Sequence, residues 1–426
     1  MAHGGDERLM PGEGKPMSGA ERATGVGRLD DACIEAVRRR IGIPMRNRQR
    51  PHNEQVTEDA LRHFAMGYGD DNPLWCDPAY GAATTWGSVI APPMFPLSAG
   101  RPLPVAWSEA EEQAMAGGDP LAGIGQYLCG ERWLFGRPVR PGAELHKRQC
   151  LDAAELKRSE FGGGVGALVS HRVEWQDGDG VVAARYLDFW HAERERSGAA
   201  AKYRTLERTH YTPDALAELD RVYEAEQVRG ATPRLWESVS VGDDVGTIAK
   251  GPLTLTDVIT YHIGIGWGGY GGGTSKVAYK NRRRVPRFYT PNDQGIPDSA
   301  QRCHWEDAWA QHLGHPAAYD YGAMRTNWMV HLVTNWIGDA GWLWKLSAAV
   351  TKFNYLGDAH LVSGTVTALR REGARAEVDV RVEGRNQRGD VTCHGTATVL
   401  LPTVAGPVVV PPPDLADVPA AVGPSA

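Results

Sequence analysis

Phe64-Ala65-Met66-Gly67-Tyr68-Gly69-Asp70-Asp71-Asn72-Pro73-Leu74 is the end of a predicted helix followed by a cluster of turn residues. The helix opens at Thr57-Glu58-Asp59 and continues through Phe64. The turn cluster ends it, because proline lacks a backbone N–H and restricts the residue before it. A Gly/Pro-rich loop follows. Beyond the loop, strand-like runs occur at 131–135, 144–151, 165–175 and 181–189.

The same order of elements returns later in the chain. A second helix opens at Thr254-Leu255-Thr256-Asp257 and meets a glycine cluster at 266–273. Strand-like runs then occur at 349–353, 360–369, 376–383 and 391–400. The turns at 177–180 and 387–390 predict hairpins. A helix followed by a meander of antiparallel strands, twice over, predicts an α+β fold in which each sheet wraps one helix.

The length favours two domains, because 426 residues exceed one ordinary core. The two ends are low-complexity segments that cannot bury a core. A helical pattern with apolar residues at three-to-four spacing lies between Pro213 and Glu226 and is typical of a linker helix. We therefore expect the following parts: a disordered N-terminal tail (1–29), a first domain (30–196), a linker with a helix (197–243), a second domain (244–402) and a Pro-rich tail (403–426).

The composition is that of an ordinary soluble globular protein. Charged residues make up 23%, hydrophobic residues 42%, and the formal net charge is −6, so no nucleic acid partner is expected. No stretch approaches the ~20 apolar residues of a membrane span, and the N-terminus has no signal-peptide core, which predicts a cytoplasmic protein. The six cysteines form no C-x-x-C pair, so neither a zinc site nor a disulfide framework is predicted.

The turn after the first helix resembles the MaoC-like hydratase/dehydratase family of hotdog proteins. Members carry a Gly-Asp-x-Asn-Pro-aliphatic-His signature, which matches Gly69 to Leu74 here. The segments 80–83 and 90–95 are similar to the N-terminal type of MaoC domain, found in fused or heteromeric dehydratases. This sequence departs from the signature at one position, because Trp75 stands where the histidine is expected.

The second half resembles the complementary part of the family. The stretch from His304 to Gly314 is similar to the family's segment that begins at the catalytic histidine, and 319–325 stands where a His-Gly-Met element leads into a helix. A departure occurs here too, because counting from Thr254 places Trp267 where the signature acid would fall. The resemblance covers about 56–402. It implies a double hotdog whose C-terminal half carries the chemistry and whose N-terminal half is degenerate.

Hydration of a 2-enoyl thioester requires an acid/base group and donors for the developing enolate. His304 is the candidate acid/base, since a neutral imidazole exchanges protons near pH 7. Asp298, six residues before it, is the preferred partner, and Asp293 and Asp70 are alternatives. Both Asp298 and Asp293 also fit a simple turn-forming role.

Gly322 is the candidate oxyanion donor, since the resemblance places its N–H at the start of a helix. We assign substrate contacts to five further residues: Trp75, Trp86, Tyr321, Arg282 and Arg283. The tryptophans would shape an acyl pocket. The arginines, from the run 280–284, would hold phosphates of coenzyme A or of a carrier-protein arm, although such a run is more often a solvated loop.

The family implies cofactor-free, metal-free acid/base catalysis on an acyl-CoA or acyl-carrier-protein thioester. The expected product is an (R)-3-hydroxyacyl-CoA. A homodimer is expected, and no membrane partner. Two alternatives remain open: a non-catalytic acyl-thioester-binding subunit of a heteromeric dehydratase, and a thioesterase on the same fold. The sequence does not identify the acyl group.

Overall fold

A ten-stranded sheet dominates the computed structural model, which describes residues 29–47, 50–159, 164–193, 206–266 and 273–421. The strand order is β1-β3-β4-β5-β2-β9-β12-β11-β10-β6, and all pairs are antiparallel except β1 with β3. The strands are β1 (Arg101–Pro102), β2 (Gly125–Phe135), β3 (His146–Ser159), β4 (Gly164–Asp177), β5 (Gly180–Ala192), β6 (Asp244–Lys250), β9 (Trp342–Val350), β10 (His360–Glu372), β11 (Arg375–Asn386) and β12 (Val391–Leu400). A separate two-stranded sheet pairs β7 (Tyr289–Pro291) with β8 (Pro297–Ser299).

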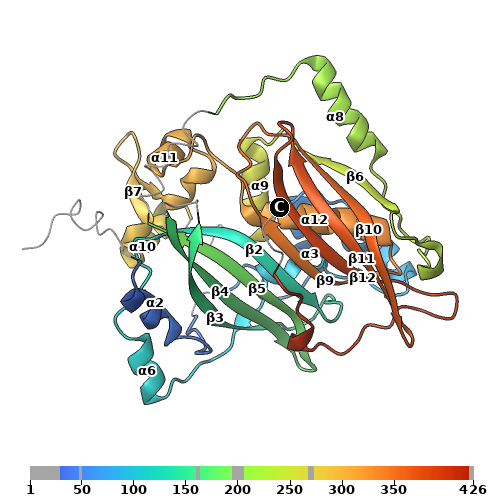
Figure 1. Ribbon diagram of the computed structural model, residues 1–426, viewed down its shortest axis with the longest axis horizontal. Helices are drawn as coiled ribbons and strands as arrows, with labels where there is room; N and C mark the ends of the chain where they lie inside the picture. The colour runs from blue at the N-terminus through green and yellow to red at the C-terminus, as the bar shows by residue number, and fades with distance from the viewer. Residues whose placement is uncertain (1–28, 48–49, 160–163, 194–205, 267–272, 422–426) are drawn as a thin grey trace, which may run out of the picture.

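The two halves of the chain meet where β2 pairs with β9. This seam runs in register from Gly130 opposite Ala349 to Leu134 opposite Lys345. Backbone hydrogen bonds across it merge the N-terminal and C-terminal strands into one surface, which Figure 1 shows as a continuous curved sheet. The halves are therefore parts of one sheet, with a core cluster that draws on both.

One long helix, α12, is held by the C-terminal strands. The helices are α2 (Asp31–Arg38), α3 (Glu58–Gly67), α4 (Pro73–Cys76), α5 (Pro78–Ala83), α6 (Glu109–Met115), α8 (Pro213–Ala225), α9 (Leu255–Ile265), α10 (Ser275–Arg284), α11 (Asp307–His312) and α12 (Gly322–Ile337). Every residue of α12 from Ala323 to Ile337 is buried, and the helix packs on β6 and on β9 to β12.

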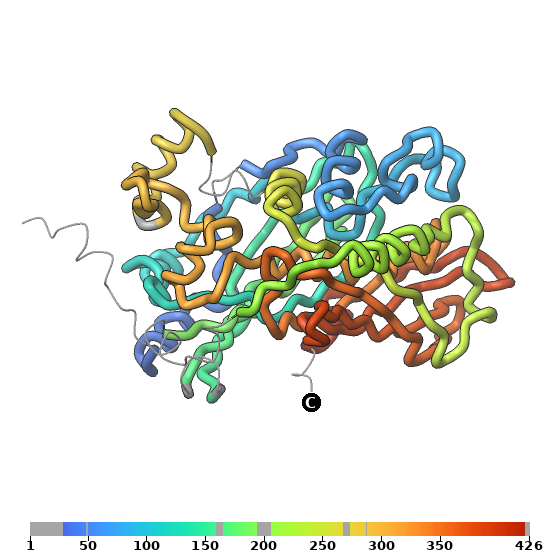
Figure 2. Tube along the Cα trace, turned by 90° about the horizontal axis from the view of Figure 1, so that it is seen from above, coloured from blue at the N-terminus to red at the C-terminus, as the bar shows by residue number. Residues whose placement is uncertain are grey.

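Helices α3 and α9 pack on each other at a backbone-to-backbone crossing. A Cβ atom added to Gly264 would lie 2.7 Å from the Cα atom of Gly67, so both positions require glycine. In Figure 2 the blue α3 region and the yellow α9 lie on one side of the molecule, and the red C-terminal strands lie on the other. The α+β double hotdog expected from the sequence is confirmed. The helix that the C-terminal strands wrap is α12, however, and not the one that opens at Thr254.

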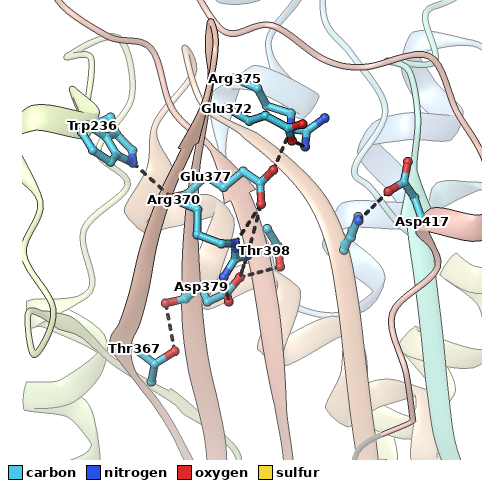
Figure 3. A network of polar contacts seen from close by, with 10 residues as sticks. Trp236, Thr367, Arg370, Glu372, Arg375, Glu377, Asp379, Thr398 and Asp417 are labelled. Atoms are coloured by element: carbon cyan, nitrogen blue, oxygen red, sulfur yellow. Dashed lines mark hydrogen bonds and ion pairs between the residues drawn. The ribbon is translucent and has the colours of Figure 1, made fainter.

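The C-terminal strands have two chemically different faces. Val378, Val380 and Val382 of β11 are completely buried toward α12, because side chains alternate between the faces of a strand. The opposite face carries the polar network of Figure 3, in which Arg370 bonds with Glu377 and Asp379. Arg370 is half exposed whereas Glu377 and Asp379 are largely buried, and the valine face supplies the apolar packing.

The C-terminal segment differs from the loose Pro-rich tail that the sequence predicts. We expected 403–426 to bury no core, yet Val408, Val410, Leu415 and Val418 pack against the main core. The Lys345 ammonium also lies 2.9 Å from the Asp417 carboxylate. The segment up to residue 421 is therefore part of the fold, because apolar side chains spaced among prolines can be buried without regular structure.

Some other sequence-based expectations agree with the structure and others do not. The linker helix is α8, and both predicted hairpins join adjacent strands, β4 to β5 and β11 to β12. The strand expected at 349–353 instead runs from Trp342 to Val350, and β6 and α2 were not predicted. Apart from Leu29, the N-terminal tail expected at 1–29 lies outside the described residues. No helix in the described ranges is long and apolar enough to cross a membrane.

Candidate active site

His304 lies at the end of a short 3-10 helix, Ala300–His304, and is partly exposed. Its Nδ1 atom is 2.9 Å from the backbone oxygen of Tyr319. Because a carbonyl only accepts, Nδ1 carries the proton and Nε2 keeps its lone pair. Burial, with a smaller contribution from nearby His262 and His315, lowers the pKa of His304 to about 4, although the hydrogen bond to the Tyr319 backbone acts in the opposite direction. The imidazole is therefore a neutral base at physiological pH.

Tyr321 lies directly against this imidazole. The two ring centroids are 3.8 Å apart, and the Tyr321 hydroxyl is 2.9 Å from Nδ1 of His262 on α9. Burial raises the pKa of Tyr321 far above its ordinary range and lowers the pKa of His262. All three side chains are therefore uncharged near neutral pH.

Gly322 begins α12, as the sequence predicted. The N–H groups in the first turn of a helix have no partner within the helix, and the helix dipole makes this end positive. A Cβ atom on Gly322 would lie 3.2 Å from Leu128 of β2 and 3.6 Å from Val350 of β9. The helix start therefore faces the seam between the halves, beside Tyr321 and His304.

The carboxylate adjacent in sequence, Asp320, is committed elsewhere. Asp320 is 1% exposed, and its two oxygens each lie 3.0 Å from a guanidinium nitrogen of Arg325. A further contact of 3.4 Å joins it to Asn354. This ion pair secures the loop that leads into α12, and the Asp320 side chain is not available as an acid/base.

In the described part of the chain, neither Asp298, the preferred partner of His304, nor the alternative Asp293 contacts the histidine. An Asp298 oxygen accepts from the Ser299 N–H at 2.6 Å, and Asp293 is exposed in the turn between β7 and β8. Arg302 instead ties this hairpin down through the backbone oxygens of Thr290, Asp298 and Ser299. Trp267, expected at the position of the signature acid, lies outside the described residues.

Asp70 keeps its signature position but has no open oxygen. It is 1% exposed and accepts hydrogen bonds from the Tyr68 hydroxyl at 2.9 Å, the Trp75 indole at 3.0 Å and the Asn72 backbone N–H at 3.0 Å. Trp75, which stands at the position of the signature histidine, therefore donates a hydrogen bond to the signature acid Asp70.

A histidine from the other half of the chain, His331, lies near Asp70. His331 of α12 lies 3.6 Å from Asp70 and 3.0 Å from Glu226, which follows α8. The Lys250 ammonium is 2.8 Å from the His331 Nδ1 and also donates to the backbone of Gly69. Burial lowers the pKa of Lys250. This closed polar cluster joins both halves to the linker, as expected of buried charges that need partners.

Trp75 and Trp86 lie toward the other end of α12 from His304, and Arg282 and Arg283 lie on α10. Trp75 lines a small cavity with Thr334 and Ile337, and Thr334 is about 18 Å along α12 from Gly322 at 1.5 Å per residue. Trp86 donates to the backbone oxygen of Asp339, beyond the same end of α12. The exposed Arg282 and Arg283 lie on α10, packed over Tyr279. In Figure 1, α10, β7 and α11 gather at one end of the molecule.

The sequence analysis missed His262. It lies in the last turn of α9, a helix that is apolar on most sides, and 59 residues separate it from its partner Tyr321. No local pattern indicates such a contact. Among the residues that the structure describes, no group of three or more His, Cys, Asp or Glu is placed to hold a metal ion.

The chain is similar in sequence and in fold to known proteins. Residues 44–185 match the model of a family described as "FAS1-like, dehydratase domain region". A UPF0336 protein from Thermobifida fusca (strain YX) is 31% identical over 113 residues, which is 26% of this chain and 70% of that protein. A solved "MaoC-like dehydratase" is 17% identical, covers 85% of this chain and 98% of its own, and gives a TM-score of 0.54.

A conserved hypothetical protein from Mycobacterium tuberculosis, described as having a double hotdog fold, is 10% identical. It covers 82% of this chain and 92% of its own, with a TM-score of 0.46. The chain belongs to the MaoC-like hydratase/dehydratase family and has its double hotdog fold. Hydratase or dehydratase chemistry is the class of activity that this family suggests.

Proposed function

We propose that the chain catalyses the reversible hydration of a 2-enoyl thioester, with His304 as the proton-transfer residue. The observation that carries this proposal is the neutral, partly exposed imidazole of His304, whose Nδ1 is bonded to the Tyr319 backbone and whose Nε2 lone pair is left to accept a proton. It lies beside the start of α12, a suitable donor for an enolate oxygen.

The reaction balances with this one residue. The water oxygen bonds to Cβ of the enoyl group as Nε2 of His304 takes one water proton, and the π electrons move onto the thioester oxygen as an enolate. The N–H of Gly322 and the positive end of α12 stabilise that negative charge. The imidazolium then returns its proton to Cα, which gives the 3-hydroxyacyl thioester. By the family resemblance the product has the (R) configuration.

The exposed arginines of α10 fit the other end of the substrate. Helix α10 has five cations and no acid in ten residues, in a chain whose net charge is −6. Arg282 and Arg283 would bind the phosphates of coenzyme A or of a carrier-protein arm. Trp75 and Trp86, at the far end of α12, have no part in this site.

A non-catalytic thioester-binding subunit is the second candidate. It is favoured by one observation: in the described residues neither Asp298 nor Asp293 contacts His304. A thioesterase on the same fold remains the third alternative.

The test is an assay of the purified protein with 2-enoyl-CoAs of several chain lengths and ring types. We expect loss of the conjugated thioester absorbance, and a decrease in kcat of about 10²–10⁴-fold in His304→Ala. The matched control is His312→Ala, an exposed histidine eight residues away, which should retain the wild-type rate. Binding of the thioester without turnover would favour the subunit function.

A further inference from the structure

One short segment, residues 319–322, supplies two groups to the proposed reaction. The backbone oxygen of Tyr319 lies 2.9 Å from Nδ1 of His304, and Gly322 begins α12. The first group determines which nitrogen of the imidazole keeps its proton, because the hydrogen bond at one ring nitrogen sets the tautomer. The second is the proposed donor to the enolate oxygen. The relative position of the base and the enolate donor therefore depends on how firmly this segment is held.

A buried carboxylate lies between these two groups in the segment. Asp320 is 1% exposed, and each of its oxygens lies 3.0 Å from a guanidinium nitrogen of Arg325, in the first turn of α12. The backbone N–H of Asp320 donates to the backbone oxygen of Asn354 at 2.9 Å. Both the side chain and the backbone of Asp320 are therefore fixed, as expected of a buried ion pair, which is stable only with good geometry and further hydrogen bonds.

Arg325 connects the same segment to the C-terminal strands. Its Nη1 donates to the backbone oxygen of Thr392 in β12 at 2.9 Å and to that of Lys352, which follows β9. The Arg325 side chain is 3% exposed. Because a guanidinium presents its donors in a rigid planar fork, these contacts set the position of Asp320 relative to the ends of β9 and β12.

We infer that the buried Asp320–Arg325 pair is a positioning device that holds segment 319–322 in the orientation that the proposed reaction needs. This inference rests on the proposed function and adds two residues to it, both of which act through the segment. Without the pair, the Tyr319 oxygen would move from Nδ1 of His304. The imidazole would then also adopt the tautomer that carries its proton on Nε2, and that nitrogen could not accept a proton from water.

Three variants separate positioning from stability in assays with the enoyl-CoA that the wild type hydrates best. Asp320→Asn leaves a buried guanidinium unpaired, which destabilises the fold, and should lower kcat by about 10²-fold with KM within about 3-fold of wild type. Combining it with Arg325→Gln removes both charges and should recover stability but not the rate, because neutral hydrogen bonds are weaker and hold the segment less firmly. Arg325→Lys keeps the charge without the fork, so its kcat should lie between those of Asp320→Asn and the wild type.

The tautomer of His304 is a measurement that does not require turnover. Long-range proton–nitrogen correlation spectra of protein with isotopically labelled histidine distinguish the two ring nitrogens, and the signals missing from His304→Ala assign them. We expect one tautomer, protonated at Nδ1, in the wild type, and a mixture in Asp320→Asn and in the double variant. The matched control is Asp188→Asn, which changes a buried carboxylate 3.1 Å from Arg132 and should alter neither the tautomer nor kcat.

A double variant that regains the wild-type rate together with its stability would overturn the inference while leaving the proposed function intact. A His304 tautomer that stays protonated at Nδ1 in every folded variant would also overturn it. If the wild type hydrates no enoyl thioester, the proposed function fails, and a tautomer mixture in the variants would still support the positioning of His304 by the pair. Urea unfolding and near-UV circular dichroism measure the stability and the native packing of each variant.

Discussion

His304, the proposed proton-transfer residue, illustrates how burial selects the neutral form of an imidazole. Its neighbours are neutral or turned away: His262 comes from α9, His315 and Tyr319 from the loop before α12, and Asp320 faces Arg325. The backbone oxygens of Tyr319 and Asp320 favour the imidazolium, but burial outweighs them, so the neutral form is favoured. A carboxylate close by would have the opposite effect and raise the pKa.

This environment predicts the pH dependence of the rate. The pKa of His304 is lowered to about 4, so the base stays deprotonated until the pH approaches that value. We expect kcat/KM to be constant from about pH 6 to pH 8 and to show its acid limb near pH 4, not near the ordinary value of about 6.5. Circular dichroism at each pH separates loss of base from loss of fold. A limb near 6.5 would contradict the assignment of His304.

Parts of the site could be predicted from the sequence and parts could not. His304 and Gly322 stand in contiguous stretches that resemble the family, so local sequence was enough to nominate them. The spacing before His304 indicates Asp298 as its partner. In the β7–β8 hairpin, however, that carboxylate accepts a hydrogen bond from the backbone N–H of Ser299. His262 reaches the site only through the tertiary packing of α9, which no spacing in the sequence encodes.

Helix α10 is an element whose surface has one sign of charge. If Arg282 and Arg283 hold substrate phosphates, replacing both by Gln should raise KM for an enoyl-CoA by about 3- to 10-fold with little change in kcat, since exposed charge contacts are individually weak. The KM difference between variant and wild type should shrink as salt is added. Arg381→Gln, an exposed arginine on β11, is the control. Equal KM values for the variant and the wild type at low salt would show that Arg282 and Arg283 do not bind the substrate phosphates.

The C-terminal segment gives a stability prediction at the same scale. Removing residues 403–426 deletes four apolar side chains that pack on the core and should lower the free energy of unfolding by about 3 kcal/mol or more. Asp417→Asn, which loses only a partly buried ion pair with Lys345, should cost about 1 kcal/mol. Urea unfolding of both variants measures this difference. A truncated chain as stable as the full chain would restore the sequence-based expectation of a loose tail.

Regular elements were easier to predict than this segment. Alternating valines and glycine-containing hairpins identify β4, β5, β11 and β12, because strand pairing and turn geometry act over a few residues. The short β6 follows the linker and contains Gly246 instead of a clear alternation of apolar and polar residues, so its sequence does not predict a strand. Prolines hid the C-terminal segment, because they exclude regular structure without excluding burial.

At the scale of the whole molecule, the seam between β2 and β9 makes the two halves one folding unit. Five residue pairs join the halves there, and Asp70, His331 and Glu226 connect both halves with the linker. We predict a single calorimetric unfolding transition whose calorimetric and van't Hoff enthalpies agree. Two resolved transitions would show that the halves unfold independently despite the shared sheet.

The closed environment of Asp70 has a consequence for stoichiometry. Because Tyr68, Trp75 and Asn72 donate to its two oxygens, we expect Asp70 to take no part in a second reaction site. A stable thioether analogue of the best enoyl-CoA should therefore bind at one equivalent per chain in calorimetric titration. A value near two would mean that the degenerate half still holds a ligand.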